Sequence, residues 1–166
     1  MTKDELEGLT DAPARHESPK PKHATDREQR RAPRRANAAI DASALLALLF
    51  TEPGAEEVAD FIASVAAVST VNLCETATVL VRRGLDAETI LSPVREQLII
   101  EPFTDADALV AATLYHQTAA KGLSLGDRAC LALADRLGSP AVTAEQVWSE
   151  LDLEIEVRVI RGPTER

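Results

Sequence analysis

The 166-residue sequence has few aromatic residues, only two cysteines and no long hydrophobic run. Cys74 and Cys130 are too few for a disulfide framework and lack the spacing of a zinc site, so we expect two buried thiols in a reducing compartment. The longest uncharged stretch, residues 61–74, has 14 residues, whereas a membrane span needs about 18. The first ten residues lack the apolar core of a signal peptide. We therefore expect a cytoplasmic protein without a membrane segment.

The motifs of several enzyme classes are also missing from the sequence. It has no GxxxxGK[ST] loop, no GxGxxG, no GxSxG and no HExxH, which argues against the corresponding nucleotide-binding, serine-hydrolase and zinc-protease sites. A phosphotransferase would need a second aspartate two residues after Asp41, but that position is Ser43. His16, His23 and His116 have no serine or cysteine nucleophile in an evident arrangement beside them.

Acidic residues exceed basic ones, and the excess is unevenly distributed along the chain. Residues 1–36 carry a net charge of +2 and four of the nine prolines, so we predict a disordered Arg/Pro-rich tail. Its five arginines at 27–35 could contact nucleic acid. Two alternatives remain open, a solvated tail and a miscalled translation start. Residues 37–166 carry −11. A domain this acidic repels nucleic acid at long range and needs a cation or a partner to bind it.

Short apolar runs alternate with helical patterns over residues 37–161, which we predict to be one domain. The expected strands are residues 37–42, 66–69, 98–103, 140–143 and 154–160. The expected helices are residues 43–50, with Ser43 as cap, 55–64, 71–83, 86–97, 104–120, 126–137 and 144–151. Such alternation favours a parallel sheet with helices on both faces, and in such sheets the ligand site lies beyond the carboxyl ends of the strands.

Four acidic residues are predicted to lie near that edge of the sheet: Asp41, Glu75, Asp127 and Glu145. Grouped carboxylates repel one another unless a cation neutralises them, and Mg²⁺ prefers a few carboxylates plus waters. Each residue also has a structural explanation, since Asp127 could cap a helix, Glu145 could be solvated and Asp41 could pair with an arginine. Asp41 argues most strongly for a site because a charge at the end of an apolar run is costly unless it is compensated.

Four stretches of the sequence resemble PIN-domain ribonucleases of the VapC toxin type. They are IDASALLALLFTEPG (40–54), VSTVNLCETATVL (68–80), LSLGDRACLALADRLGSPAVTAEQVW (123–148) and LEIEVRVIR (153–161). The resemblance covers about residues 37–161 and leaves 162–166 as a short C-terminal tail. It implies a three-layer α/β/α sandwich with a mainly parallel sheet of four to five strands, and an endoribonuclease that depends on Mg²⁺ or Mn²⁺.

The acidic pattern of this family carries over onto Asp41, Glu75 and Asp127. On this resemblance, Asp41 and Asp127 would bind the cation, and Glu75 would bind it or orient the attacking water. The fourth acid of the family is usually the aspartate of a T-x-D element, which here reads Thr143-Ala144-Glu145. Glu145 would therefore complete the coordination or hold a second ion.

Three polar residues match supporting positions around these carboxylates. Ser43 and Thr143 match the family's hydroxyl positions, where they would hydrogen-bond the carboxylates. Asn72 lies three residues before Glu75, which places both on one helical face.

The resemblance further implies an RNA substrate, a cognate VapB-like antitoxin and a homodimer. Two other interpretations remain open. One is a catalytically silent PIN-like binding module, which the glutamate at position 145 would favour. The other is a metal-dependent phosphatase acting on a small phosphoester, which an acidic site would also suit.

Overall fold

The computed structural model describes residues 35–161, which are organised around a five-stranded sheet. Its strands are β1 (Ala39–Ile40), β2 (Ala67–Ser69), β3 (Ile99–Glu101), β4 (Ala141–Thr143) and β5 (Val157–Val159). They lie in the order β3-β2-β1-β4-β5, and every neighbouring pair is parallel. The predicted parallel sheet is confirmed. The expected tails at 1–36 and 162–166 fall almost entirely outside the described residues.

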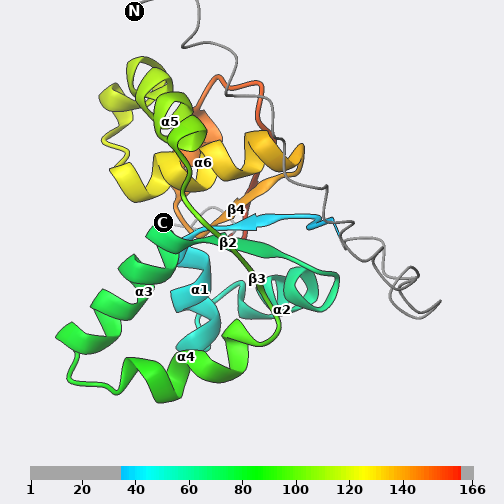
Figure 1. Cartoon of the computed structure of the whole chain (residues 1–166), viewed down its shortest axis with the longest axis vertical. Coiled ribbons are helices and arrows are strands. Elements are labelled where there is room, and N and C mark those ends of the chain that lie inside the picture. The colour runs from blue at the N-terminus through cyan, green and yellow to red at the C-terminus, as the bar shows by residue number, and fades with distance from the viewer. Residues whose placement is uncertain (1–34, 162–166) are drawn as a thin grey trace, which may run out of the picture. The chain divides into compact units, whose positions relative to one another are not determined.

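Helices cover both faces of this sheet and complete the predicted three layers (Figure 1). The first four are α1 (Ala42–Leu49), α2 (Ala55–Ala63), α3 (Thr70–Arg82) and α4 (Ala87–Arg95). They are followed by α5 (Asp105–Thr118), α6 (Leu125–Leu137) and the 3₁₀ helices η2 (Ala119–Lys121) and η3 (Gln146–Glu150). Among the described helices, none is long and apolar enough to cross a membrane.

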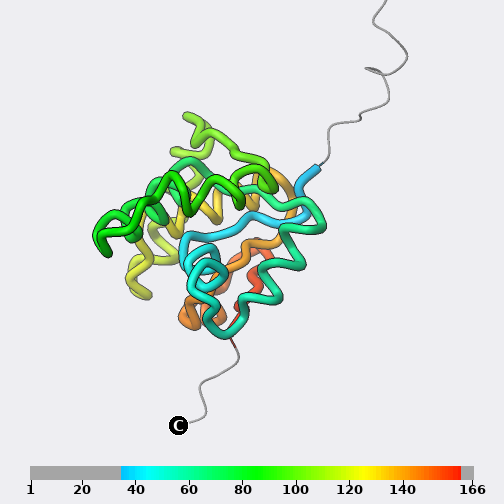
Figure 2. Tube along the Cα trace, turned by 90° about the horizontal axis from the view of Figure 1, so that it is seen from below, coloured from blue at the N-terminus to red at the C-terminus, as the bar shows by residue number. Residues whose placement is uncertain are grey.

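Successive side chains along each strand point to opposite faces of the sheet, so each strand contributes to two hydrophobic cores. Ile40 and Val68 point toward a cluster formed with α1 and α2, whereas their neighbours Ala39 and Ala67 point toward a cluster formed with α5 and α6. In Figure 2, which views the domain from the side of α4, the helix α1 lies between α2 and the α3–α4 segment. Because β1 is central and buried on both faces, Asp41, the residue that follows it, is held in a fixed position.

Three local predictions differ from the structure. Helix α1 begins at Ala42, and its cap is Asp41 rather than Ser43, because the Asp41 side chain accepts the Ser43 N–H. Residues 144–151 contain the short 3₁₀ helix η3 instead of an α-helix. Cys74 is exposed on α3 while Cys130 is buried, so the expectation of two buried thiols is wrong for Cys74.

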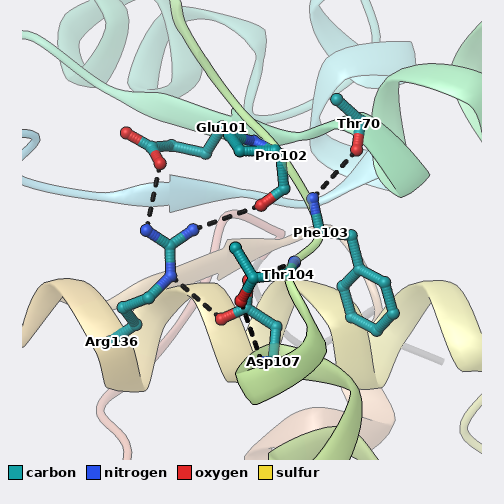
Figure 3. Close-up of polar contacts among 7 residues, drawn as sticks. All are labelled: Thr70, Glu101, Pro102, Phe103, Thr104, Asp107 and Arg136. Carbon is teal, nitrogen blue, oxygen red and sulfur yellow. Dashed lines mark hydrogen bonds and ion pairs between the residues drawn. The ribbon is translucent and has the colours of Figure 1, made fainter. Parts of the chain in front are cut away.

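A cluster of polar contacts ties β3 and α5 to α6 (Figure 3). Arg136 donates hydrogen bonds to Asp107 at 2.9 Å, to Glu101 at 3.0 Å and to the carbonyl of Pro102 at 3.4 Å. Asp107 in turn closes a capping box with Thr104 at the start of α5. Since all three nitrogens of the Arg136 guanidinium are used in these contacts, this cluster is structural: it fixes α6, whose first turn carries Asp127.

Candidate active site at the carboxyl edge of the sheet

Residues following three neighbouring strands converge at one edge of the sheet. Asp41 comes directly after β1, Glu75 lies in α3 after β2, and Glu145 follows β4 closely. Because β2, β1 and β4 are adjacent and parallel, their carboxyl ends meet at the same edge. Asp127, in the first turn of α6, lines the same cavity as the other three carboxylates.

Asp41 is the most constrained of these residues, with only 1% of its surface exposed. Its Oδ2 accepts hydrogen bonds from the Ser43 N–H at 3.1 Å, the Ser43 hydroxyl at 2.6 Å and the Thr143 hydroxyl at 3.2 Å. Its Oδ1 accepts one from Asn72 Nδ2 at 3.0 Å. Oδ1 therefore keeps acceptor capacity that Oδ2 has already used.

The two hydroxyl groups that hold Asp41 are themselves oriented by the backbone after β4. The Ala144 N–H donates to Ser43 Oγ at 2.9 Å, and the Glu145 N–H donates to Thr143 Oγ1 at 3.1 Å. With these donors on their oxygens, the hydroxyl protons are directed toward Asp41 or toward each other. The segment that carries Glu145 is thus attached to the cap of α1.

Asn72 connects Asp41 to the start of α6. It is fully buried, and its Nδ2 donates both to Asp41 Oδ1 and to the carbonyl oxygen of Gly126 at 3.0 Å. The other amide atom, Oδ1, has no hydrogen-bond partner within the described part of the chain. The amide nitrogen lies between two acceptors, so both of its N–H groups are used and Asn72 holds Asp41 against the start of α6.

Asp127 occupies the third position of α6 and forms a capping box with Ser124. The Ser124 N–H donates to Asp127 Oδ2 at 2.6 Å, and the Asp127 N–H donates to Ser124 Oγ at 3.2 Å. The capping role considered for Asp127 is therefore present, and it is compatible with a second role because Oδ1 takes no part in the box. The half-exposed Asp127 also lines the cavity beside Asp41.

Burial and neighbouring carboxylates raise the pKa values of Asp41 and Glu75. The pKa of Asp41 is raised from 3.8 to about 6, mainly because burial disfavours the charged form and further because Asp127 is nearby; the hydrogen bonds from Ser43 oppose this. The pKa of Glu75 is raised by partial burial of its carboxylate and then by Asp41 and Asp127. Burial and the same two aspartates raise the pKa of the Cys130 thiol. The site therefore has an excess of negative charge that a cation would neutralise.

A cavity of about 420 Å³ opens at this edge, and Asp41, Glu75, Asp127 and Glu145 all line it. Within residues 35–161, Lys121 is the only Lys or Arg in its lining. Lys121 forms an ion pair with Glu150 of η3. The predicted acids are therefore brought to one cavity, with Glu145 exposed and Asp41 buried.

This donor set fits a hard divalent cation. Carboxylate oxygens are the ligands that Mg²⁺ and Mn²⁺ prefer, and Asp41 Oδ1 retains a free lone pair. In the described part of the chain, no three His, Cys, Asp or Glu side chains stand close enough to hold an ion by themselves. Mg²⁺ usually keeps several waters and uses one or two carboxylates, so Asp41 and Asp127 are the residues best suited to hold it.

Three residues of this site were not predicted from the sequence: Ser124, Lys121 and Gly126. Ser124 could have been found, because Ser124-Leu125-Gly126-Asp127 has the spacing of a capping box. Lys121 and Gly126 carry no such local signal, because their places in the site depend on how η2 and α6 pack.

Solved structures share this fold at low sequence identity. A toxin–antitoxin complex from Klebsiella pneumoniae has a TM-score of 0.59 at 16% identity, with 75% of this chain and 98% of that chain covered. VapC20 of Mycobacterium tuberculosis, a toxin that cleaves the sarcin–ricin loop, has 0.57 at 20%, with 68% and 94% covered. DNA-bound VapBC from Salmonella typhimurium has 0.58 at 16%, with 75% and 98% covered.

Comparison with curated proteins gives no significant match. The PIN domain model, however, matches residues 38–153, which is more than half of the chain and includes all four acidic residues. The sheet order, the carboxylate edge and this match agree. The chain belongs to the PIN domain family.

Proposed function

We propose that this protein is a metal-dependent endoribonuclease and the toxin of a toxin–antitoxin pair. The observation that carries the proposal is Asp41, a buried carboxylate held by four hydrogen-bond donors and facing a cavity that three other acids line. A carboxylate buried in this way is costly for folding unless a cation compensates it. Hydrolysis of a phosphodiester is the chemistry that best suits such a cation site.

The environment of each residue suggests its role in the proposed hydrolysis. Mg²⁺ or Mn²⁺ bound here would polarise the phosphodiester and lower the pKa of a coordinated water. Asp41 would bind the ion through Oδ1, while Ser43 and Thr143 hold its Oδ2 in place. Glu75, whose pKa is raised, would bind the ion, or accept a hydrogen bond from the attacking water and orient it.

Because the domain is acidic, RNA needs a positively charged side chain at the cavity in order to bind there. Lys121 supplies one, because it lines the cavity and its ion pair with Glu150 is exposed on both sides, at 38% and 61%. An exposed ion pair contributes little stability, so Lys121 is free to exchange Glu150 for a phosphate group. We expect Lys121 to contact the RNA backbone rather than a base.

The proposed partners follow from the solved relatives. The Klebsiella protein was solved in a toxin–antitoxin complex and the Salmonella protein as VapBC on DNA. By analogy we propose a cognate antitoxin that covers the acidic cavity, a homodimer, a cytoplasmic location and activity confined to residues 37–161. Co-expression with an antitoxin-like neighbouring gene should suppress cleavage and give a complex that survives gel filtration.

The central test uses the full-length protein with a structured RNA and, separately, p-nitrophenyl phosphate. We expect RNA cleavage that requires Mg²⁺ or Mn²⁺, stops with EDTA and is lost in Asp41→Asn. Hydrolysis of p-nitrophenyl phosphate without RNA cleavage would identify a phosphatase instead. RNA binding by the wild-type protein without any cleavage would identify a silent binding module.

A further inference from the structure

Gly126 faces the carboxylate of Glu75 across the gap between α3 and α6. A Cβ atom placed on Gly126 would lie 2.2 Å from Glu75 Oε2 and 3.1 Å from Glu75 Cδ. Side-chain atoms do not approach that closely, so the Glu75 carboxylate occupies the space that any other residue at position 126 would fill. Gly126 has ordinary helical backbone geometry, because it is not among the positive-φ glycines. Its importance lies in the missing side chain.

The backbone of Gly126 also connects to two other carboxylates of the site, those of Asp41 and Asp127. Its carbonyl oxygen accepts from Asn72 Nδ2, and the same nitrogen donates to Asp41 Oδ1. The next residue in the chain is Asp127. One short piece of backbone therefore contacts Glu75 directly, Asp41 through a single amide group and Asp127 through one peptide bond.

We propose that Gly126 is a positioning residue, whose lack of a side chain lets the Glu75 carboxylate reach the first turn of α6 beside Asp127. The effect of Gly126 on metal binding and cleavage rests on the proposed function. The effect of Gly126 on the position of the Glu75 carboxylate is independent of that function. Gly126 does not line the cavity, and it acts by setting where Glu75 lies. A residue with a Cβ separates Glu75 from the two aspartates.

Replacement by alanine should leave the fold intact. The atoms that a Cβ would clash with belong to the far end of the Glu75 side chain, which is flexible and exposed, whereas Ser124 Oγ would lie at an ordinary contact distance of 3.4 Å. That side chain can swing toward solvent without moving either helix. Alanine also favours a helix more than glycine does, so the melting temperature should stay the same or rise.

The experiment compares the full-length wild type with Gly126→Ala by Mn²⁺ titration calorimetry, RNA cleavage and a crystal structure determined without metal. We expect the Mn²⁺ dissociation constant to rise about 10-fold, as for other changes that displace a ligand's support. The metal-free crystal structure should show the Glu75 carboxylate moved away from residue 126. Cleavage should regain part of its rate at high Mn²⁺.

Two further variants separate positioning from stability. Gly138→Ala, at the other end of α6, strains a backbone with φ of 61° where no atom lies within 4 Å. It should lower the melting temperature and leave Mn²⁺ binding unchanged. Glu75→Asp should weaken Mn²⁺ binding in the wild type but have a smaller effect in Gly126→Ala, since Glu75 is already displaced there.

The inference is overturned if the crystal structure of Gly126→Ala shows the Glu75 carboxylate in its original place. It is also overturned if the wild type cleaves RNA and Gly126→Ala binds Mn²⁺ as tightly as the wild type does. Failure of the proposed function looks different. The wild type would then bind no Mn²⁺ and cleave no RNA, while the position of Glu75 in the metal-free crystal structure would still decide the role of Gly126.

Discussion

The hydroxyl groups of Ser43 and Thr143 lie 3.0 Å apart, although 100 residues separate them in the chain. Both contact the same oxygen of Asp41, Ser43 from the first turn of α1 and Thr143 from the end of β4. The neighbouring parallel strands β1 and β4 bring them together. This contact orients the buried carboxylate on which the proposed chemistry depends.

Removing either hydroxyl should weaken metal binding before it weakens the fold. In Ser43→Ala, Asp41 loses its shortest hydrogen bond and the Ala144 N–H loses its acceptor, which should cost about 1–2 kcal/mol of stability. We expect the Mg²⁺ concentration for half-maximal cleavage to rise about 10-fold in Ser43→Ala and in Thr143→Val. Thr143→Ser keeps the hydroxyl and is the matched control. Equal Mg²⁺ dependence in all four proteins would contradict the role given to these groups.

Asp41 should make the metal-free protein less stable as the pH rises. Its pKa is 3.8 when unperturbed and about 6 in the folded protein, so between these values the folded state binds more protons than the unfolded state. The free energy of unfolding therefore falls with rising pH in this window, by about 2 kcal/mol between roughly pH 4 and 7.5, and the cost persists above it.

Urea unfolding in EDTA measures this effect as the difference between the wild type and Asp41→Asn at both pH values. Taking the difference removes the contributions of carboxylates elsewhere. We expect Asp41→Asn to gain stability relative to the wild type as the pH increases, and Mg²⁺ to stabilise the wild type more at high pH. A difference that does not change with pH would show that Asp41 stays charged at little cost.

Glu145 should be less critical than the two aspartates. It is exposed at the cavity rim, and its side chain is one methylene longer than the aspartate usual at this position. Since Mg²⁺ needs near-ideal geometry, we expect Glu145 to act through a water or on a weakly held second ion. Glu145→Gln should lose less activity than Asp41→Asn or Asp127→Asn, and Glu145→Asp should keep or raise it. Initial cleavage rates of these variants across a Mg²⁺ titration measure the difference. If Glu145→Gln is as inactive as Asp41→Asn, Glu145 binds the ion directly.

Lys121 and Glu150 should have opposite effects on RNA binding. Lys121→Met removes the positive charge of the cavity and should raise KM several-fold with little change in kcat, and the salt dependence of binding should weaken by about 0.7 in slope. Glu150→Gln frees Lys121 and should lower KM. Arg95→Met, which breaks an exposed ion pair lining a different pocket, is the control. If KM responds equally to Lys121→Met and Arg95→Met, Lys121 has no specific contact.

Arg136 should matter for stability rather than for catalysis. Arg136→Met leaves the buried Asp107 without its cationic partner and frees Glu101, so unfolding free energy should fall by about 2 kcal/mol. Arg95→Met breaks the exposed pair with Glu88 and should cost less than about 1 kcal/mol. Urea unfolding compares the two variants, with cleavage per folded molecule as the second measurement. Equal losses of stability would show that the Arg136 cluster is no more than a surface ion pair.

Short-range patterns in the sequence determined much of this structure. Apolar runs, capping residues and glycines placed the five strands and six helices to within a few residues, because hydrophobic periodicity and caps act over a single turn or strand. The position of Asp41 after an apolar run, and of Glu145 after another, was enough to direct attention to one edge of a parallel sheet.

Only the tertiary structure decided which atoms meet at that edge. The order β3-β2-β1-β4-β5 puts β4 beside β1, and this alone brings Thr143 to Ser43. The packing of α3 against α6 places Glu75 over Gly126, and η2 carries Lys121 to the cavity. The contacts of Thr143 with Ser43 and of Asn72 with Gly126 join residues 50 or more positions apart. They depend on strand order and helix packing, which the burial of the whole core selects and no local pattern encodes.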